Sequence, residues 1–381
     1  MDFELSKEQK DIAVAAKEFA EGEFTDRAEE FDRDETFDEA LYKKAAELGF
    51  VGTFIKEEYG GPAMGMLEYC LIFEEFAAVD PGIAVAILFS SYGAEIVQEF
   101  GTEEQKQKYL PPIARGEGVM GSAFTEPDAG SDLASATHTT AIRDGDNYII
   151  NGSKIFITNG DRANDLICFV VTDQDNPSKH RRHSMIMVET DREGFEANHL
   201  TGKLGIRASD TAELSFNNVR VPSSNLVGDP GNGFFEAMYL FNMDRITVAA
   251  QAVGTARGAL EEAIKYVKKR IAFGAPLSSF QSIQFKIADM FMWIQAGRNL
   301  VYEAAWRVDQ GNIDPKLIAA AKSFCGQMSM KCCDMALQMH GGYGYLAEYK
   351  VQRLFRDAKI TEIYEGTTEI EKLIIARNLL T

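Results

Sequence analysis

The hydrophobic periodicity of this chain changes twice, and these changes restrict its fold more than any other feature. Up to about residue 120 the apolar residues recur at helical spacing, as in FDEALYKKAAELGF, where Gly49 is a stop signal. After Gly121 they alternate along short runs that are separated by polar turns, and from about Gly233 the helical spacing returns. This order predicts an α+β fold in which a β domain lies between two helical domains along the chain.

We divide the sequence at these changes into an N-terminal all-α domain (residues 1–121), a middle β-sheet or barrel domain (residues 122–232) and a C-terminal helical bundle (residues 233–381). The run GIAVAILFSSYGAEIVQEFG in the first domain is apolar nearly all round, which predicts one buried helix. In the middle domain, Asn151-Gly152 lies between two alternating runs and predicts a β-hairpin turn. Three later runs, DLICFVVTD, HSMIMVET and AELSFNNVRVP, predict further strands.

The charge balance excludes several kinds of partner. The chain has 39 Lys and Arg against 58 Asp and Glu, a net charge of −19, which argues against nucleic acid and anionic membranes as partners. No apolar run reaches the ~18 residues of a membrane span, and the N-terminal segment lacks a signal-peptide pattern. The five cysteines form no Cys-x-x-Cys pair, so we expect free thiols in a reducing compartment. The expected location is the bacterial cytosol or, as a mature form, the mitochondrial matrix.

Two common kinds of site are not expected. GGYGYLA, residues 341–347, matches the spacing of a dinucleotide fingerprint, but it follows a helix, whereas the fingerprint must follow a strand in a βαβ unit. Glu196 and His199 form a lone Glu-x-x-His in a region of strands and turns, where the two side chains do not share a face. We therefore predict neither a nicotinamide-type Rossmann site nor a metal site.

Several short stretches carry candidate binding residues. In AFTEPDAGSD, Thr125 and Ser131 offer hydroxyls beside a glycine turn, which suits an anion or a polar ring edge, although the stretch taken alone favours an ordinary turn. Arg270 belongs to a basic cluster at a helix end, where it also suits the helix dipole. Arg245 lies in an apolar helix and needs a partner, either a carboxylate such as Asp244 or a ligand anion.

The stretch DAKITEIYEGTTEI, residues 357–370, raises a chemical question. A helical pattern stops at Glu365-Gly366 and restarts at once, and Thr368 with Glu371 matches a capping box for the last helix. Glu365 then lies just before a helix N-terminus, whose dipole favours an ionised carboxylate, while burial between apolar neighbours and a ligand would raise its pKa. Such a carboxylate is a candidate base near neutral pH; the alternative is a solvated acid at a helix entry.

These motifs together resemble the acyl-CoA dehydrogenase family from end to end. AFTEPDAGSD, GSKIFITNG, KLGIRASDTAEL, RIAFGAPLSSFQ, QMHGGYGY and RDAKITEIYEGTTEI occur in the family's order. The chain looks closest to the short-chain, butyryl-CoA type. The resemblance implies an N-terminal helical domain, a middle β domain and a C-terminal four-helix bundle, assembled as a homotetramer. It also implies one non-covalent FAD per subunit.

The reaction implied by the resemblance is α,β-dehydrogenation of an acyl-CoA thioester to the trans-2-enoyl-CoA, in the degradation of fatty or other carboxylic acids. Glu365 would remove the α-proton while flavin N5 accepts the β-hydride. The thioester carbonyl would accept hydrogen bonds from the Glu365 N–H and from a ribityl hydroxyl of FAD, and Gly366 would leave room for the thioester. Electrons would pass to an electron-transfer flavoprotein.

The resemblance also assigns binding residues. Around the flavin and pyrophosphate it places Phe124, Thr125, Ser131, Phe156, Thr158, Thr367 and Glu369. At the adenosine diphosphate half, across a subunit interface, it places Arg270, Gln281, Gln338, Gly341 and Gly342. On the substrate and CoA side it places Ser131, Asn242, Arg245 and Gly366, with Asn242 standing where the family often has an acid.

Substrate and acceptor stay open at this point. The butyryl-type resemblance favours a short acyl chain, but Phe89, Ser90, Ser91 and Tyr92 could shape a pocket for a branched or alicyclic group such as cyclohexanecarboxyl. No cation lies on that predicted helix, which argues against a glutaryl substrate. Alternatives are an oxidase that uses oxygen as acceptor and a non-catalytic acyl-CoA-binding or assembly relative.

Overall fold

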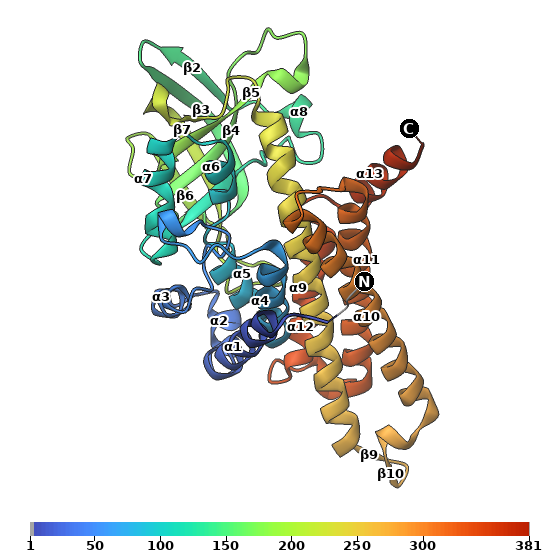
Figure 1. Cartoon of the computed structure of the whole chain (residues 1–381). Coiled ribbons are helices and arrows are strands. Elements are labelled where there is room, and N and C mark those ends of the chain that lie inside the picture. The colour runs from blue at the N-terminus through green and yellow to red at the C-terminus, as the bar shows by residue number, and fades with distance from the viewer. Residues whose placement is uncertain (1–3, 381) are drawn as a thin grey trace.

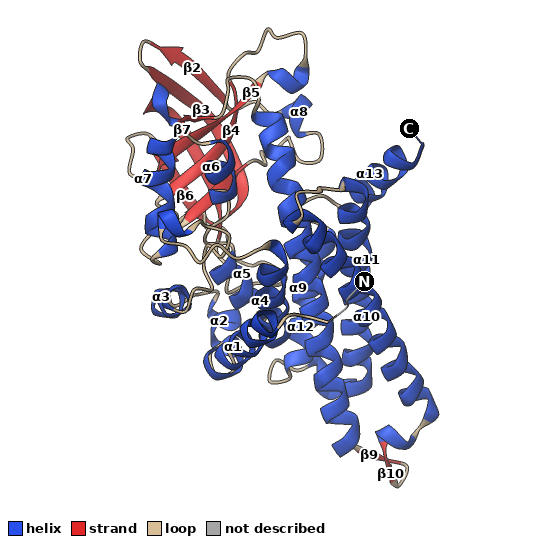
Figure 2. Cartoon of the chain, viewed as in Figure 1, coloured by secondary structure: helices blue, strands red, loops and turns tan. Residues whose placement is uncertain are grey.

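Helices occupy both ends of the chain and strands lie between them, as Figure 2 shows. The structure, a computed structural model, describes residues 4–380. The predicted α+β class, with a β domain between two helical domains, is confirmed by this element order. The exact division at residues 121/122 and 232/233 stays a prediction; the first strand begins at Met120 and the helix that opens the C-terminal domain begins at Gly233.

The N-terminal domain consists of short helices around a hydrophobic core. Its helices are α1 (Lys7–Glu23), α2 (Ala28–Asp34), α3 (Glu39–Glu47), α4 (Met66–Val79), α5 (Pro81–Leu88), α6 (Ala94–Phe100) and α7 (Glu103–Ala114). A capping box between Ser6 and Gln9 begins α1, and Asp80 caps α5 through the Ile83 N–H. The core is rich in aromatic rings, with Phe76 contacting the rings of Phe19, Phe24 and Phe50.

The prediction of one buried helix at residues 82–101 is wrong in one respect, because this run forms two helices with a break at residues 89–93. The hydroxyls of Ser90 and Ser91 donate to the carbonyls of Ile87 and Leu88, which competes with continuation of the helix. Gly93 then adopts a φ of +103°. The break joins the helical domain to the sheet, since the Met120 N–H donates to the Ser90 carbonyl at 2.8 Å.

The middle domain is a mixed sheet of eight strands. Its elements are β1 (Met120–Ala123), α8 (Leu133–Ala136), β2 (Thr140–Asp144), β3 (Asn147–Thr158), β4 (Asp165–Val171), β5 (His183–Glu189), β6 (Phe195–His199), β7 (Thr211–Pro222) and β8 (Leu226–Val227). The strand order is β6-β7-β3-β2-β4-β5-β8, and β1 pairs in parallel with β4. The runs predicted as strands are β4, β5 and β7.

The predicted hairpin turn at Asn151-Gly152 is wrong. These residues lie inside β3, where a register shift between Ile150 and Gly152 interrupts the pairing with β7. Gly152 has a φ of +147°, and a Cβ there would lie 2.4 Å from the Thr139 hydroxyl, so a bulge and not a turn requires glycine at this position. The hairpin itself turns at Gly145, between β2 and β3.

Long helices dominate the C-terminal domain (Figure 1). They are α9 (Gly233–Lys269), α10 (Gln281–Asp309), α11 (Pro315–His340), α12 (Lys350–Ala358) and α13 (Thr368–Leu380), with the two-residue strands β9 (Ile271–Ala272) and β10 (Ala275–Pro276) between α9 and α10. Helix α12 packs on α9 and α11, and α13 packs on α11. Among residues 4–380, no helix combines the length and the apolar character that crossing a membrane requires.

Small residues on α9 allow the two helical domains to pack closely. A Cβ on Gly254 would lie 2.3 Å from the Glu74 carbonyl, and one on Gly258 would lie 2.2 Å from the Ala78 carbonyl, so α4 contacts the α9 backbone directly. The side chains of Arg257 and Arg298 also meet the buried Glu74 carboxylate, which joins α4, α9 and α10. The position of α9 is therefore fixed against both neighbours.

A buried ion pair holds the segment that follows β1. The Lys154 ammonium, whose side chain is 0% exposed, donates to Glu126 Oε1 at 2.8 Å and to the carbonyls of Phe124 and Phe169. Glu126 also accepts hydrogen bonds from the backbone N–H groups of His138 and Thr139. One lysine thus connects β3, β4 and the loop after β1.

We predict that Lys154→Met lowers the free energy of unfolding by about 3 kcal/mol or more, because it leaves the Glu126 carboxylate buried without a cation. Urea unfolding followed by circular dichroism measures this change. The double variant Lys154→Met, Glu126→Gln should recover part of the loss, since the amide oxygen still accepts from the backbone without a charge. A single variant as stable as the wild type contradicts the prediction.

Candidate active site

Glu365 lies in a break between two helices. The short 3-10 helix η6 (Lys359–Glu362) follows α12, and α13 begins only at Thr368. Within the break, Glu365 has a φ of +53° and Gly366 has a φ of +101°. A left-handed conformation is costly for a residue other than glycine and persists only where its surroundings fix it. The contacts that hold this segment therefore matter.

Two buried cations hold the break through its carbonyl oxygens. Arg245 Nε donates to the Glu365 carbonyl at 3.1 Å and to Glu371 Oε1 at 2.9 Å. Lys322 Nζ donates to the Gly366 carbonyl. The ionic partner of Arg245 is therefore Glu371 on α13, and the suggested structural partner Asp244 is not its ion-pair partner.

The capping box predicted from Thr368 and Glu371 is wrong. The Ile370 N–H donates to the Thr367 hydroxyl and the Glu371 N–H donates to the Thr367 carbonyl, so Thr367 begins α13. The Thr368 hydroxyl donates to the Glu362 carbonyl. Glu371 pairs with Arg245 of α9 instead of capping the helix.

The two carboxyl oxygens of Glu365 differ in their surroundings. Oε1 accepts a hydrogen bond from the Tyr92 hydroxyl at 2.7 Å, whereas Oε2 is buried and has no hydrogen-bond partner among the described residues. Burial raises the pKa of Glu365 above its ordinary value, while the Tyr92 hydrogen bond and the charges of Arg245 and Lys322 act against this rise. The arrangement leaves one oxygen free to accept a proton.

A first group of predicted binding residues gathers where the sheet meets α9. The Ile155 N–H donates to the Thr125 carbonyl at 2.9 Å, which brings the loop after β1 next to β3. Phe124 packs on Phe241 of α9, with ring centroids 4.9 Å apart. Phe156 is 66% exposed with a φ of +60°, and Thr158 ends β3. Ser131 is exposed in the loop that follows Thr125.

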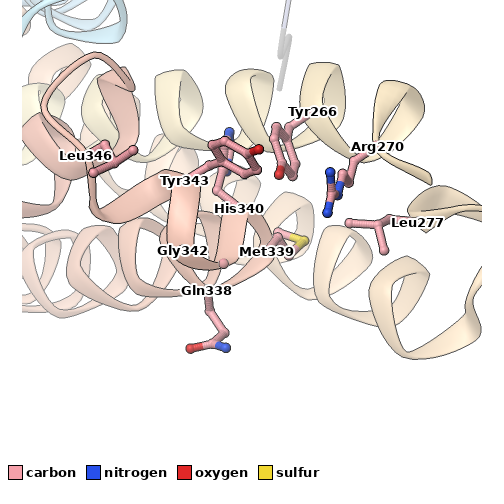
Figure 3. Close-up of a pocket in the computed structure, with 10 residues that line it drawn as sticks. Tyr266, Arg270, Leu277, Gln338, Met339, His340, Gly342, Tyr343 and Leu346 are labelled. Carbon is pink, nitrogen blue, oxygen red and sulfur yellow. The ribbon is translucent and has the colours of Figure 1, made fainter. Parts of the chain in front are cut away.

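A second group lines a cavity of about 460 Å³ at the far end of α9 (Figure 3). Arg270 faces the Tyr343 ring at 5.6 Å, and Gln338, Gly341 and Gly342 complete the predicted members. A Cβ on either glycine would contact nothing within 4 Å, so the cavity is open at this point. Gln281, at the start of α10, is not among the residues that line this cavity.

The two groups lie apart within one chain. Phe241 is near the start of α9 and Arg270 directly follows its end, and an α-helix rises 1.5 Å per residue, so the groups are separated by roughly 40 Å. In Figure 1 the sheet and the β9–β10 tip lie at opposite ends of the molecule. Thr367 lies half-buried in the break and Glu369 is exposed on α13. Asn242 Oδ1 accepts from Arg245 Nη1 at 3.4 Å.

Sequence reasoning missed three residues of the site. Lys322 and Glu371 hold the break, and Tyr92, which was considered only as a pocket wall, contacts Glu365 itself. A lysine inside the apolar run LIAAAKSFCG is a signal for Lys322, since a buried lysine needs an acceptor. No local signal identifies the partner of Tyr92. Within the described part of the chain, no cluster of metal-ligating side chains is present.

Comparison with known proteins matches the whole chain. Three family models match in order: "Acyl-CoA dehydrogenase, N-terminal domain" at residues 6–117, "Acyl-CoA dehydrogenase, middle domain" at residues 121–219 and "Acyl-CoA dehydrogenase, C-terminal domain" at residues 231–380. The probable acyl-CoA dehydrogenase YngJ of Bacillus subtilis is 44% identical over 100% of both chains. The acryloyl-CoA reductase (NADH) of Anaerotignum propionicum is 42% identical over 100% of this chain and 96% of the other. The short-chain specific acyl-CoA dehydrogenase of Clostridium acetobutylicum is 42% identical over 99% of both.

Solved structures agree with this result. Butyryl-CoA dehydrogenase from Megasphaera elsdenii has a TM-score of 0.96 at 40% identity, and 100% of both chains is covered. A chain from a structure of the electron transferring flavoprotein of Acidaminococcus fermentans has a TM-score of 0.97 at 43% identity, again with 100% of both chains covered. With its helical, β and helical domains matched in order and its relatives matched along their full length, this enzyme belongs to the acyl-CoA dehydrogenase family.

Proposed function

We propose that the protein is an FAD-dependent dehydrogenase that converts an acyl-CoA thioester to the trans-2-enoyl-CoA, with Glu365 as the base that removes the α-proton. The observation that carries this proposal is the unpartnered, buried Oε2 of a carboxylate in a helix break. Among the described residues, the Glu365 N–H also makes no hydrogen bond, so it is available to a thioester carbonyl. A polarised carbonyl makes the α-proton acidic enough for a carboxylate to remove.

The residues present fit FAD. Phe156 is exposed near the end of β3, where Thr158 ends the strand, and the loop that carries Thr125 contacts the same strand through the Ile155 N–H. An exposed aromatic ring with two threonines on adjoining segments suits a flavin ring. Arg270 supplies a cation beside an open glycine pair, which suits a pyrophosphate. Bound FAD would supply the hydride acceptor for the β-carbon. We further assign Phe124, Ser131, Thr367 and Glu369 to the flavin end and Gln281, Gln338, Gly341 and Gly342 to the other.

The separation of the two groups supports an oligomer, because roughly 40 Å is longer than one dinucleotide. A second subunit would supply the Arg270 group to the flavin end of the first, and we propose a homotetramer as in the family resemblance. Large apolar side chains at the β9–β10 tip and on α10 lie exposed in the single chain, among them Phe273 at 98%, Phe285 at 63% and Phe291 at 55%. Several large apolar side chains that are exposed in the single chain favour a protein partner that covers them.

A short acyl chain is the proposed substrate, with Ser131, Asn242, Arg245 and Gly366 on the substrate side. The short-chain relative and the butyryl-CoA dehydrogenase structure support this choice. Branched or alicyclic acyl groups are the alternative, since the Phe89 ring stacks on Tyr92, whose hydroxyl contacts Glu365. The rates of flavin reduction by butyryl-, isobutyryl-, octanoyl- and cyclohexanecarboxyl-CoA would rank these acyl groups as substrates.

The cytosol is the proposed location, supported by five buried cysteines that form no disulfide. An electron-transfer flavoprotein is the proposed electron acceptor, and the match to a chain from a structure of such a flavoprotein supports it.

We expect Glu365→Gln to bind FAD and remain yellow but to lose flavin bleaching by butyryl-CoA by at least about a thousandfold, because an amide cannot accept the α-proton. Anaerobic stopped-flow absorbance measures the loss. Glu348→Gln, the same change at an exposed site, should bleach like the wild type. Bleaching of Glu365→Gln at the wild-type rate would remove Glu365 from the mechanism.

Replacement of Arg270 should weaken FAD retention. Arg270→Gln removes the cation proposed for the pyrophosphate, so the dissociation constant for FAD should rise about tenfold or more. Fluorescence of released flavin on dilution measures this change. Lys269→Gln, which removes the same charge one residue earlier at an exposed position, is the control. Equal FAD affinity in the two variants would contradict the assignment of Arg270.

The electron acceptor can be tested with the same holoenzyme. With butyryl-CoA and oxygen alone, we expect no hydrogen peroxide above the control without substrate, and turnover should require an added electron-transfer flavoprotein. Peroxide formed at the rate of substrate consumption would favour the oxidase instead. A colourless protein that takes up no FAD would favour the non-catalytic relative.

A further inference from the structure

The segment between α5 and α6 ends against the proposed base. Tyr92 is 7% exposed, its ring stacks on Phe89 at 5.5 Å, and its hydroxyl donates to Glu365 Oε1 at 2.7 Å. The Tyr92 carbonyl accepts from the Ser122 hydroxyl of β1 at 3.2 Å, and the Tyr92 N–H donates to the Phe89 carbonyl. Ring and backbone are therefore both fixed, so the direction of the phenol is set by the fold before any ligand binds.

Two further carboxyl groups share this interior. Asp244 of α9 is 2% exposed, and its Oδ2 is buried without a partner among the described residues. Glu95 of α6 accepts from the Gly93 N–H at 3.0 Å. Burial raises the pKa of Glu95 to about 7 and that of Asp244 well above its usual range, and the charge of Glu365 raises both further. Carboxyl groups that raise one another's pKa in a poorly solvated interior do not all ionise together.

The charges of Arg245 and Lys322 do not by themselves decide which of the three carboxyl groups is ionised. Arg245 and Lys322 lower the pKa of Glu365, but Arg245 lowers that of Asp244 as well. Glu371, the ionic partner of Arg245, offsets much of that cation's charge. Tyr364 donates its hydroxyl to Gln251, so it gives no proton to the cluster.

The hydrogen bond of the Tyr92 hydroxyl sets Glu365 apart from the other two carboxyl groups. A phenol has one proton to donate, and this proton points at Glu365 Oε1. Asp244 Oδ2, by contrast, is buried without a hydrogen-bond partner among the described residues, so no such bond stabilises a charge on this oxygen. A hydrogen bond to an ionised acceptor is stronger than one to a neutral acceptor, so this arrangement favours the charge on Glu365.

We propose that Tyr92 is a positioning residue that assigns the negative charge of a three-carboxyl cluster to Glu365 and holds Oε1, so that the unpartnered Oε2 is the atom that takes the substrate proton. This rests on the proposed function of Glu365. Asp244 and Glu95 stay neutral, so the cluster does not carry more negative charge than its surroundings can stabilise. The site therefore needs a hydroxyl at position 92 and not merely an aromatic ring.

The test uses the holoenzyme and the pH dependence of flavin reduction by butyryl-CoA. Only the carboxylate form of Glu365 accepts a proton, so the wild-type rate falls as the pH drops through the pKa of Glu365. Tyr92→Phe keeps the ring on Phe89 but removes the donor, and should move this acid limb upward by about one pH unit. Asp244→Asn replaces a carboxyl that the proposal holds neutral with a neutral amide, so alone it should leave the limb in place. In the Tyr92→Phe background, where Asp244 can compete for the charge, it should reverse part of the upward shift.

A second readout does not depend on the cofactor. Infrared difference spectra between pH values, recorded on the protein without FAD, follow the carboxyl band that Glu365→Gln removes; Tyr92→Phe should shift the midpoint of this band upward by a similar amount. A variant that is slower by the same factor at every pH, with the band unmoved, would overturn the proposal and leave Tyr92 as packing alone. A wild type that shows no flavin bleaching with any acyl-CoA would instead overturn the proposed function, while the infrared result would still decide the role of Tyr92.

Discussion

The double hydrogen bond from Arg245 is the interaction on which the candidate site depends. One guanidinium nitrogen connects the carbonyl of Glu365 to the carboxylate of Glu371, and so joins the two sides of a helix break to α9. Without this connection, a left-handed glutamate would relax, because nothing in the local sequence favours a φ of +53°. The strain at Glu365 is thus balanced by a buried ion pair, and the base is held in position by contacts to its backbone, which leaves its carboxyl group for chemistry.

Helix α9 serves as the common frame for every part of the site. Phe241 packs on Phe124, Arg245 donates to the carbonyl of Glu365, the proposed base, and Arg270 follows the last turn of the helix. The same helix approaches α4 so closely at Gly254 and Gly258 that it cannot slide without steric overlap. One long helix therefore fixes the distance between Glu365, the proposed base, and Arg270, which we propose for the cofactor of another subunit.

The sequence predicted the domain order and the position of Glu365 well, because both are local properties. Periodicity within a few residues distinguishes helix from strand, and the helical pattern of apolar residues stops at Glu365-Gly366. The errors concern residues whose contacts lie far away in the sequence. Asn151-Gly152 became a bulge because β3 continues across it to pair with β7, and Glu371 left its expected capping role for an arginine on another helix. Tyr92 and Glu365 are 273 residues apart, so no local pattern could join them.

Gly366 makes this arrangement hard to alter by single steps. A Cβ at this position would lie 2.2 Å from Glu371 Oε1, so any other residue must displace the carboxylate that Arg245 requires. Loss of Glu371 leaves the guanidinium without its counter-charge, and loss of Arg245 frees the backbone beside the base. Each of the three residues thus depends on the other two. A substitution at one of them requires compensating substitutions at the others if the conformation of the turn at Glu365 is to be kept.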